Sequence, residues 1–224
     1  MNQYDAFWKA FAISAAVFMT GVYVGILLDS GRVDEVRAEY TGMDIQTSDA
    51  RLQSLYYQTF GGTENFCGPA IEENLAFSDK VYRQGLKIDE YEKVNKFAPT
   101  LIDEKRRYVL LKLQFWLNAI ELKKTCDADY VNVVYFYSHY NGTAQEQVQS
   151  TVLRDLKEKY GRDMMLIPLP MDMNISTIDA IKKQYGIVSS PTILIDEKTV
   201  LSGLQGVDAL DGRISRALQE KRVQ

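Results

Sequence analysis

The sequence predicts an α/β fold in which helices flank a central mixed sheet, preceded by a helical hairpin and an N-terminal apolar helix. Three observations carry this prediction: an uncharged run near the N-terminus, two long helix-forming segments on either side of Pro99, and alternating strand and helix patterns after Tyr130. We expect four parts: a flank at 1–9, a membrane helix at 10–30, a helical stalk at 31–126, and an α/β domain at 127–224.

The composition excludes several classes of protein. The chain has 224 residues, 46% of them hydrophobic and 25% charged, as in ordinary globular proteins. A net charge of −4 argues against nucleic acid as a partner, because affinity for phosphate backbones comes from clustered Lys and Arg. With one histidine and two cysteines, no zinc site of usual spacing can be assembled, so we expect no metal and no cofactor.

Residues Ala10–Leu28 contain no charge and predict a single membrane-spanning helix that uses the lipid bilayer as its partner. A helix of 19 residues covers about 28 Å, close to the ~30 Å hydrocarbon core. Phe7, Trp8 and Tyr23 supply aromatic side chains towards the two interfaces. Gly21 and Gly25 form a small-xxx-small pair, which makes a homodimer through this helix a candidate assembly.

Two alternatives to an anchor are a cleaved signal peptide and the buried helix of a soluble protein. The apolar run is longer than the ~7–15 residues of a typical signal, and no small-x-small cleavage site precedes Asp29. On both sides of the apolar segment, acidic residues offset the Lys and Arg residues. The charge distribution therefore does not predict which end of the helix faces the cytoplasm.

The middle of the chain predicts three helices. The first begins at Thr47–Asp49 and ends at Gly61–Gly62, with one apolar face formed by Leu52, Leu55, Tyr56 and Phe60. The next two meet at Phe97–Ala98 and should form an antiparallel hairpin. Their expected apolar stripes are Ile71, Leu75, Tyr82 and Leu86 in one helix, and Leu101, Tyr108, Leu111, Phe115 and Leu122 in the other.

The two cysteines stand at matching distances from this turn. Cys67 lies about 30 residues before it and Cys126 about 28 after it, so both arms are about 40 Å long. We therefore expect a Cys67–Cys126 disulfide at the open end of the hairpin, worth about 4 kcal/mol on the chain-entropy model. Such a disulfide would indicate that this part of the chain lies outside the cytoplasm, in an oxidising compartment. The alternative is two unrelated buried thiols, which would give no information on the compartment.

After Tyr130 the pattern alternates between strands and helices. Strands are predicted at 131–137, at 164–169, within the stretch 185–196 and near 199–201, and helices at 145–160, 175–185 and 208–222. The first half implies a parallel strand–helix–strand unit, and the last two strands imply a hairpin.

The stretch from Tyr185-Gly-Ile to Ser190-Pro191-Thr192-Ile-Leu-Ile resembles the cis-proline segment of thioredoxins, and the likeness covers about 95 residues from Tyr130. Gly206 is placed like the glycine after that family's strand hairpin. The resemblance implies a cis bond before Pro191 and a groove at Ser190, Pro191 and Thr192 that pairs with an extended peptide. An ordinary trans turn proline is the alternative.

The same resemblance aligns the family's CxxC pair with Asn141, Gly142, Thr143 and Ala144, so both sulfurs are missing. Thiol–disulfide exchange needs an attacking and a resolving thiol, which this slot lacks. We interpret His139, beside the slot, as a loop residue. Asn141-Gly-Thr and Asn174-Ile-Ser match the N-glycosylation pattern, which makes Asn141 and Asn174 candidate acceptors outside the cytoplasm.

The leading hypothesis is a membrane-anchored, redox-inactive thioredoxin-like protein whose extracytoplasmic domain binds an unidentified peptide or protein. It is similar to the membrane-tethered thioredoxin-like proteins of archaea, in which related chains often keep the CxxC pair. Two alternatives are a thiol–disulfide oxidoreductase that uses Cys67 and Cys126, and a structural subunit of a membrane complex that uses the Gly21/Gly25 face.

Overall fold

The computed structural model describes residues 3–94 and 99–222, with the side chains of 3–6, 27–43, 89–94, 99–101, 104 and 222 left aside. The expected turn at Phe97–Ala98 therefore lies outside the described residues. The chain forms two units, Met1–Ile45 and Gln46–Gln224.

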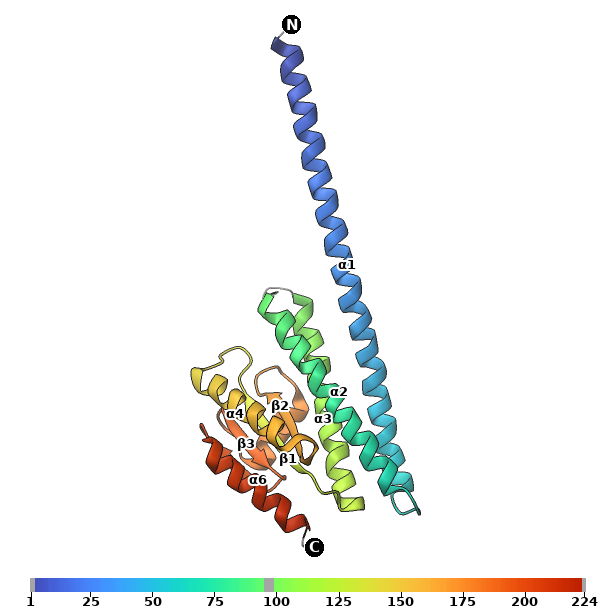
Figure 1. Cartoon of the computed structure of the whole chain (residues 1–224), viewed down its shortest axis with the longest axis vertical. Coiled ribbons are helices and arrows are strands. Elements are labelled where there is room, and N and C mark those ends of the chain that lie inside the picture. The colour runs from blue at the N-terminus through green and yellow to red at the C-terminus, as the bar shows by residue number, and fades with distance from the viewer. Residues whose placement is uncertain (1–2, 95–98, 223–224) are drawn as a thin grey trace. The chain divides into compact units, whose positions relative to one another are not determined.

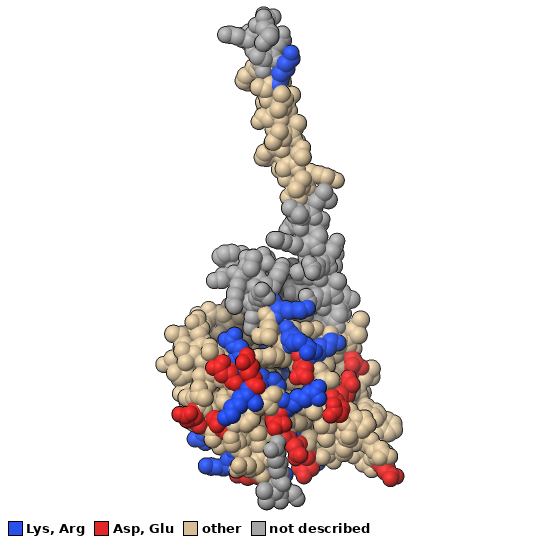
Figure 2. All heavy atoms as spheres, in the orientation of Figure 1, with Lys and Arg blue, Asp and Glu red and all other residues tan. Residues whose placement is uncertain are grey.

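The first unit is the N-terminal part of helix α1 (Gln3–Phe60). Its segment Phe7–Ile26 has a mean hydropathy of 1.6 over 20 residues and is long and apolar enough to cross a membrane. Large apolar side chains along it are exposed, among them Phe11, Val17 and Phe18. In Figure 2 the segment after residue 9 is a tan stretch without a Lys, Arg, Asp or Glu side chain among its described residues. Signal sequences share these properties, and orientation does not follow from them.

Helix α1 continues without a break through Thr47–Asp49, so the helix start expected there is wrong. Ser, Thr and Asp favour caps but are tolerated inside a helix that packing stabilises. The expected face is also wrong: the structure buries Ala50 and Tyr57 and leaves exposed Leu52, Leu55, Tyr56 and Phe60. The small Ala50 side chain lets helix α3 approach closely enough for Asn118 Nδ2 to donate to the Ala50 carbonyl at 2.9 Å.

Helices α2 (Cys67–Val94) and α3 (Pro99–Cys126) pack as the expected hairpin. The rings of Phe77 and Phe115 lie 6.0 Å apart, and the Tyr108 hydroxyl donates to the Val81 carbonyl at 2.7 Å, which fixes an antiparallel arrangement. In α2 the buried face is rotated from the expected one and comprises Ala70, Asn74, Phe77, Ser78 and Val81. In α3 the structure buries Tyr108, Leu111, Phe115 and Leu122 of the expected stripe, and the side chain of Leu101 lies outside the described residues.

The sheet has the strand order β2-β1-β3-β4. Strands β1 (Val131–Tyr137) and β2 (Met164–Pro170) are parallel, β3 (Thr192–Ile195) runs antiparallel to β1, and β4 (Thr199–Ser202) forms a hairpin with β3. The mixed sheet flanked by helices confirms the predicted fold class. Buried β-branched and aromatic side chains along β1 explain why it occupies the centre of the sheet.

One face of the sheet packs against helices α4 (Ala144–Tyr160) and α6 (Val207–Arg222). Its core combines alternate β1 residues with apolar side chains of both helices: Val131, Val133, Tyr135, Leu153, Leu156, Leu210, Ile214 and Leu218. Figure 1 shows these two helices beside the strands. Burial of this face follows the two-residue period of a strand.

The opposite face carries the other β1 residues, including Val134 and Phe136, which are also fully buried. Helix α3 contacts this side through β2, where Lys112 Nζ donates to the Pro168 carbonyl. Helix α5 (Ser176–Tyr185) contributes buried Ile178 and Ile181. The hairpin is therefore a layer of the compact unit, whose boundary falls after Ile45, whereas we expected a separate stalk that ended at residue 126.

Candidate functional site

The Ser190–Pro191 peptide bond is cis and lies directly before β3. The Pro191 carbonyl accepts the Gly203 N–H at 2.8 Å, and the Thr192 hydroxyl donates to the Ser189 carbonyl at 2.7 Å. The backbone N–H and C=O of Ser190 make no hydrogen bond to any described residue. Unpaired backbone groups beside a strand can pair with an extended peptide, as in other modes of β-strand addition.

The slot residues Asn141, Gly142 and Thr143 form the loop between β1 and α4, and Ala144 is the first residue of α4. Thr143 is the N-cap in a capping box with Glu146. Its N–H donates to Glu146 Oε2 at 2.6 Å, and Glu146 N–H donates to the Thr143 hydroxyl at 3.3 Å. Two of the helix-terminal donors therefore have partners within the chain.

Glu146 also fixes the two loops relative to each other. Its Oε1 accepts the Ser138 N–H at 2.7 Å, and its carboxylate is hydrogen-bonded to the Ser190 hydroxyl. Burial by itself would raise the pKa of Glu146, but donation from the backbone of Ser138 and Thr143 and from the two hydroxyls lowers it below its ordinary value. One ionised side chain thus joins the end of β1, the start of α4 and the cis-proline loop.

Asp172, just after β2, holds the slot loop from the other side. It accepts the Ser138 hydroxyl at 2.6 Å and the N–H groups of His139 and Tyr140 at 2.8 and 3.1 Å. Burial opposes ionisation, yet these donors lower the pKa of Asp172 below its ordinary value. Sequence reasoning missed both carboxylates; the available signals were a Thr-x-x-Glu capping box and an acid directly after a buried strand.

His139 reaches beyond the slot to helix α3. Its Nδ1 lies 3.3 Å from Lys105 Nζ, and the neighbouring Arg106 Nε donates to the Met173 carbonyl at 3.0 Å. The N-terminal half of α3 therefore borders the slot. Within the described residues no three His, Cys, Asp or Glu side chains gather as metal ligands.

Two exposed apolar side chains flank the groove loops. Val188, two residues before Ser190, is 89% exposed, and Tyr140, in the slot loop, is 52% exposed. Exposed apolar side chains beside unpaired backbone groups are the combination that an extended peptide requires. We keep the name cis-proline groove for the peptide-binding region predicted at Ser190, Pro191 and Thr192, and include in it the neighbouring Val188 and Tyr140.

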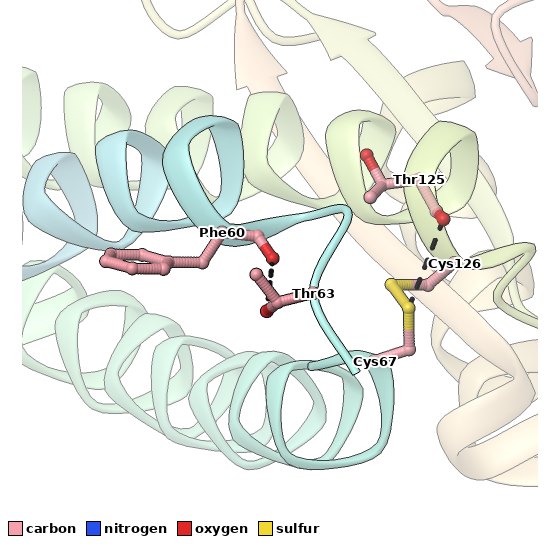
Figure 3. The surroundings of a disulfide bond; sticks show 5 residues. All are labelled: Phe60, Thr63, Cys67, Thr125 and Cys126. Carbon is pink, nitrogen blue, oxygen red and sulfur yellow. Dashed lines mark hydrogen bonds between the residues drawn. A yellow bond between two sulfur atoms is a disulfide. The ribbon is translucent and has the colours of Figure 1, made fainter. Parts of the chain in front are cut away.

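Cys67 and Cys126 form a disulfide that joins the first residue of α2 to the last residue of α3 (Figure 3). Around it pack Tyr57, Phe66, Ala70 and Leu122. Helix α3 runs 20 residues from Arg106, which borders the slot, to Cys126, a rise of about 30 Å. The disulfide and the cis-proline groove are therefore separate sites.

Both candidate glycosylation acceptors are exposed. Asn141 lies in the slot loop, and Asn174 follows the Asp172–Met173 turn with a φ of 55°. Their modification stays a prediction.

The sequence matches no protein-family model and no curated protein. Among solved structures, the chain is similar to a malarial protein at 25% identity, over 40% of this chain and 98% of that chain, with a TM-score of 0.32. It is similar to thioredoxin-2, a component of the malaria parasite's protein secretion machinery, at 24% identity over 39% of this chain and 82% of that one, with a TM-score of 0.32. It is also similar to chloroplastic thioredoxin z, at 14% identity over 41% of this chain and 80% of that one, with a TM-score of 0.34.

The strand order, the parallel β1–β2 pair and the cis-proline before β3 identify the α/β part of the chain as a thioredoxin-like fold.

Proposed function

We propose that this chain is a membrane-anchored thioredoxin-like protein that binds an extended peptide segment of a partner protein and performs no thiol–disulfide exchange at its slot. The observation that carries the proposal is the cis-proline groove. There, the unpaired backbone groups of Ser190 stand beside a slot loop that contains Asn141 and Ala144 where the related enzymes have cysteines.

The rigidity of the groove supports binding. Glu146 and Asp172 hold the slot loop, and the Ser190 hydroxyl is bonded to the same Glu146 carboxylate. A peptide therefore meets loops that are already in place, and less ordering entropy opposes its binding.

The chemistry of the slot argues against exchange. Glu146 and Thr143 already bond to the first turn of α4, where the related enzymes stabilise a thiolate. The chain's only two cysteines are joined to each other about 30 Å along α3 from the slot, so neither supplies the missing sulfur.

The anchor is the second part of the proposal. Segment Phe7–Ile26 supports retention in the bilayer, and the disulfide supports an oxidising compartment for the domain. Extraction of membranes with alkaline carbonate, followed by intact mass, tests it. We expect the full-length chain in the pellet, and a shortened soluble chain would instead show a cleaved signal.

The groove is tested with a phage-displayed random peptide library selected on the full chain in nanodiscs. Val188→Asp places a charge beside Ser190 and should weaken the enriched peptides at least about tenfold, a cost of ~1.4 kcal/mol. Val148→Asp, on an exposed position of α4, is the matched control and should leave binding unchanged. Equal losses in both variants, or no enrichment, would contradict the proposal.

The oxidoreductase alternative is tested by insulin reduction. We expect no turnover above that of the Cys67→Ser/Cys126→Ser variant. Turnover that disappears in this variant would instead assign the activity to the disulfide, and copurification of a complex without any peptide binding would favour the structural subunit.

A further inference from the structure

At the end of the sheet opposite to the cis-proline groove, three elements enclose an open cleft of about 620 Å³. They are the C-terminal end of α3, the turn between β3 and β4, and the C-terminal half of α6. This volume lies within the ~300–1,000 Å³ range of small-molecule sites. The cleft shares no residue with the groove.

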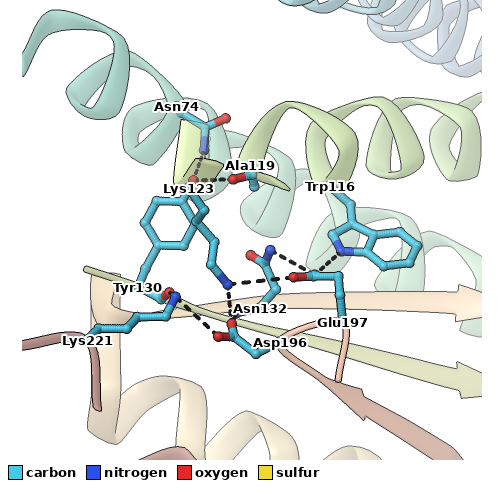
Figure 4. Close-up of polar contacts among 9 residues, drawn as sticks. All are labelled: Asn74, Trp116, Ala119, Lys123, Tyr130, Asn132, Asp196, Glu197 and Lys221. Carbon is cyan, nitrogen blue, oxygen red and sulfur yellow. Dashed lines mark hydrogen bonds and ion pairs between the residues drawn. The ribbon is translucent and has the colours of Figure 1, made fainter. Parts of the chain in front are cut away.

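The floor of the cleft carries an acid, Asp196, that the protein itself neutralises (Figure 4). Lys123 from α3 and Lys221 from α6 both pair with its carboxylate, the latter at 3.2 Å. The backbone N–H of Asn132 donates to it at 3.2 Å. Asp196 therefore already has two cations and one neutral donor.

The neighbouring acid, Glu197, is neutralised in the same way. Its Oε1 accepts Trp116 Nε1 at 2.7 Å and Asn132 Nδ2 at 3.0 Å, and Lys123 Nζ lies 3.6 Å from Oε2. Because Asp196 and Glu197 are already paired in this way, neither is available to neutralise the other cations that line the cleft.

The walls carry four further cations whose side chains have no hydrogen bond or ion pair to the described residues: Lys124, Lys198, Arg213 and Arg216. All four are exposed. Asp127 and Glu220 are the remaining acids of the lining, so six cations face four acids. The resulting net charge of +2 stands out in a chain whose net charge is −4.

The state of Lys221 agrees with an excess of positive charge. Burial and the adjacent Lys123 ammonium lower the pKa of Lys221 to about 8, although Asp196 acts in the opposite direction. A negative ligand in the cleft would relieve this repulsion.

We propose that this cleft binds a small anion that carries a phosphate group. Arg213 and Arg216 are three residues apart on α6, so their guanidinium groups project from neighbouring positions and can each donate two hydrogen bonds to phosphate oxygens. Lys124 and Lys198 supply charge from the other two walls. Ile120 and Ala217 offer apolar surface to an organic part of the ligand. A soluble phosphate ester and a lipid headgroup share this chemistry.

The probe is inorganic pyrophosphate, titrated calorimetrically into the full chain in phosphatidylcholine nanodiscs. We expect binding that weakens as salt rises and that falls at least about tenfold in Arg213→Gln/Arg216→Gln, because charge-assisted hydrogen bonds are lost. Arg83→Gln/Arg154→Gln removes the same charge from exposed positions of α2 and α4 outside the cleft and should bind as the unchanged chain does.

A second variant, Lys198→Gln on the β3–β4 turn, should also weaken binding, which keeps the test independent of α6. No binding of pyrophosphate, or equal losses in the cleft and control variants, would overturn the proposal. Nanodiscs that contain phosphatidic acid distinguish the sources of phosphate. If phosphatidic acid weakens pyrophosphate binding to the unchanged chain but not to Arg213→Gln/Arg216→Gln, the natural ligand is a lipid headgroup. If the pyrophosphate affinity is the same with and without this lipid, the natural ligand is a soluble phosphate ester.

Discussion

The Glu146 carboxylate accepts the backbone N–H of Ser138 at 2.7 Å. This hydrogen bond joins the residue directly after β1 to the first turn of α4. Together with Asp172, which accepts the Ser138 hydroxyl at 2.6 Å, Glu146 holds the loop between β1 and α4 in place.

Replacement of Glu146 should therefore lower the stability of the folded chain. Glu146→Ala leaves the N–H groups of Ser138 and Thr143 without their acceptor and should lower the free energy of unfolding by about 2 kcal/mol. Chemical denaturation of the full chain in detergent measures this loss. Glu158→Ala, on an exposed position of the same helix, should change it by less than about 0.5 kcal/mol.

Acid should destabilise the fold through the same loop. The folded-state pKa values of Glu146 and Asp172 lie below their ordinary values of 4.5 and 3.8, so their stabilisation is complete above these values. It is lost as the pH falls through the lower, folded-state values, because the unfolded chain then binds more protons. Denaturation midpoints measured from neutral to acid pH should fall less steeply in Asp172→Asn, whereas Asp155→Asn, an exposed control, should follow the unchanged chain.

The disulfide should stabilise the hairpin and have no effect on peptide binding at the cis-proline groove. Cys67→Ser/Cys126→Ser opens a loop with a sequence separation of 59, which should lower the free energy of unfolding by about 4 kcal/mol. Peptide affinity at the groove should not change, because the two sites are about 30 Å apart along α3. An unchanged melting temperature would show that the bridge contributes nothing to stability.

Gly85 should be intolerant of a methyl group. A Cβ at this position would lie 2.4 Å from the Tyr108 hydroxyl, which donates to the Val81 carbonyl. Gly85→Ala should therefore lower the free energy of unfolding by about 1–3 kcal/mol, although alanine favours helices. Gly212→Ala, with no atom within 4 Å, should raise it.

A double-mutant cycle tests the proposed cause. Tyr108→Phe removes the obstructing oxygen, so Gly85→Ala should cost less in that background than in the unchanged chain. Equal costs in the two backgrounds would show that the hydroxyl is not the obstacle.

Much of the fold could be read from the sequence because local patterns and tertiary structure agree there. The β1 prediction matches its observed bounds, since six of its seven residues, all but Asn132, are β-branched or aromatic and suit a strand that is buried on both faces. The prediction for α3 succeeded because the middle of that helix, residues 108–120, is mostly apolar and packs between α2 on one side and the sheet on the other.

Predictions failed where several faces competed for burial. Leu52 and Tyr56 formed the more apolar face of α1, yet the structure buries Ala50 because its small side chain permits close helix packing. Hydrophobic periodicity records only how apolar a face is, and not whether its shape fits a neighbouring helix.

The order of elements, the uncharged segment 10–28 and the proline before β3 follow from the amino-acid sequence. The position of the hairpin over the sheet, the contacts of Glu146 and Asp172 with the loop after β1, and the meeting of Lys123 and Lys221 at Asp196 were visible only in the folded chain. Most of these features join residues that are far apart in the sequence. Local patterns report the periodicity of one element, whereas charge pairs and layers join residues up to about a hundred positions apart.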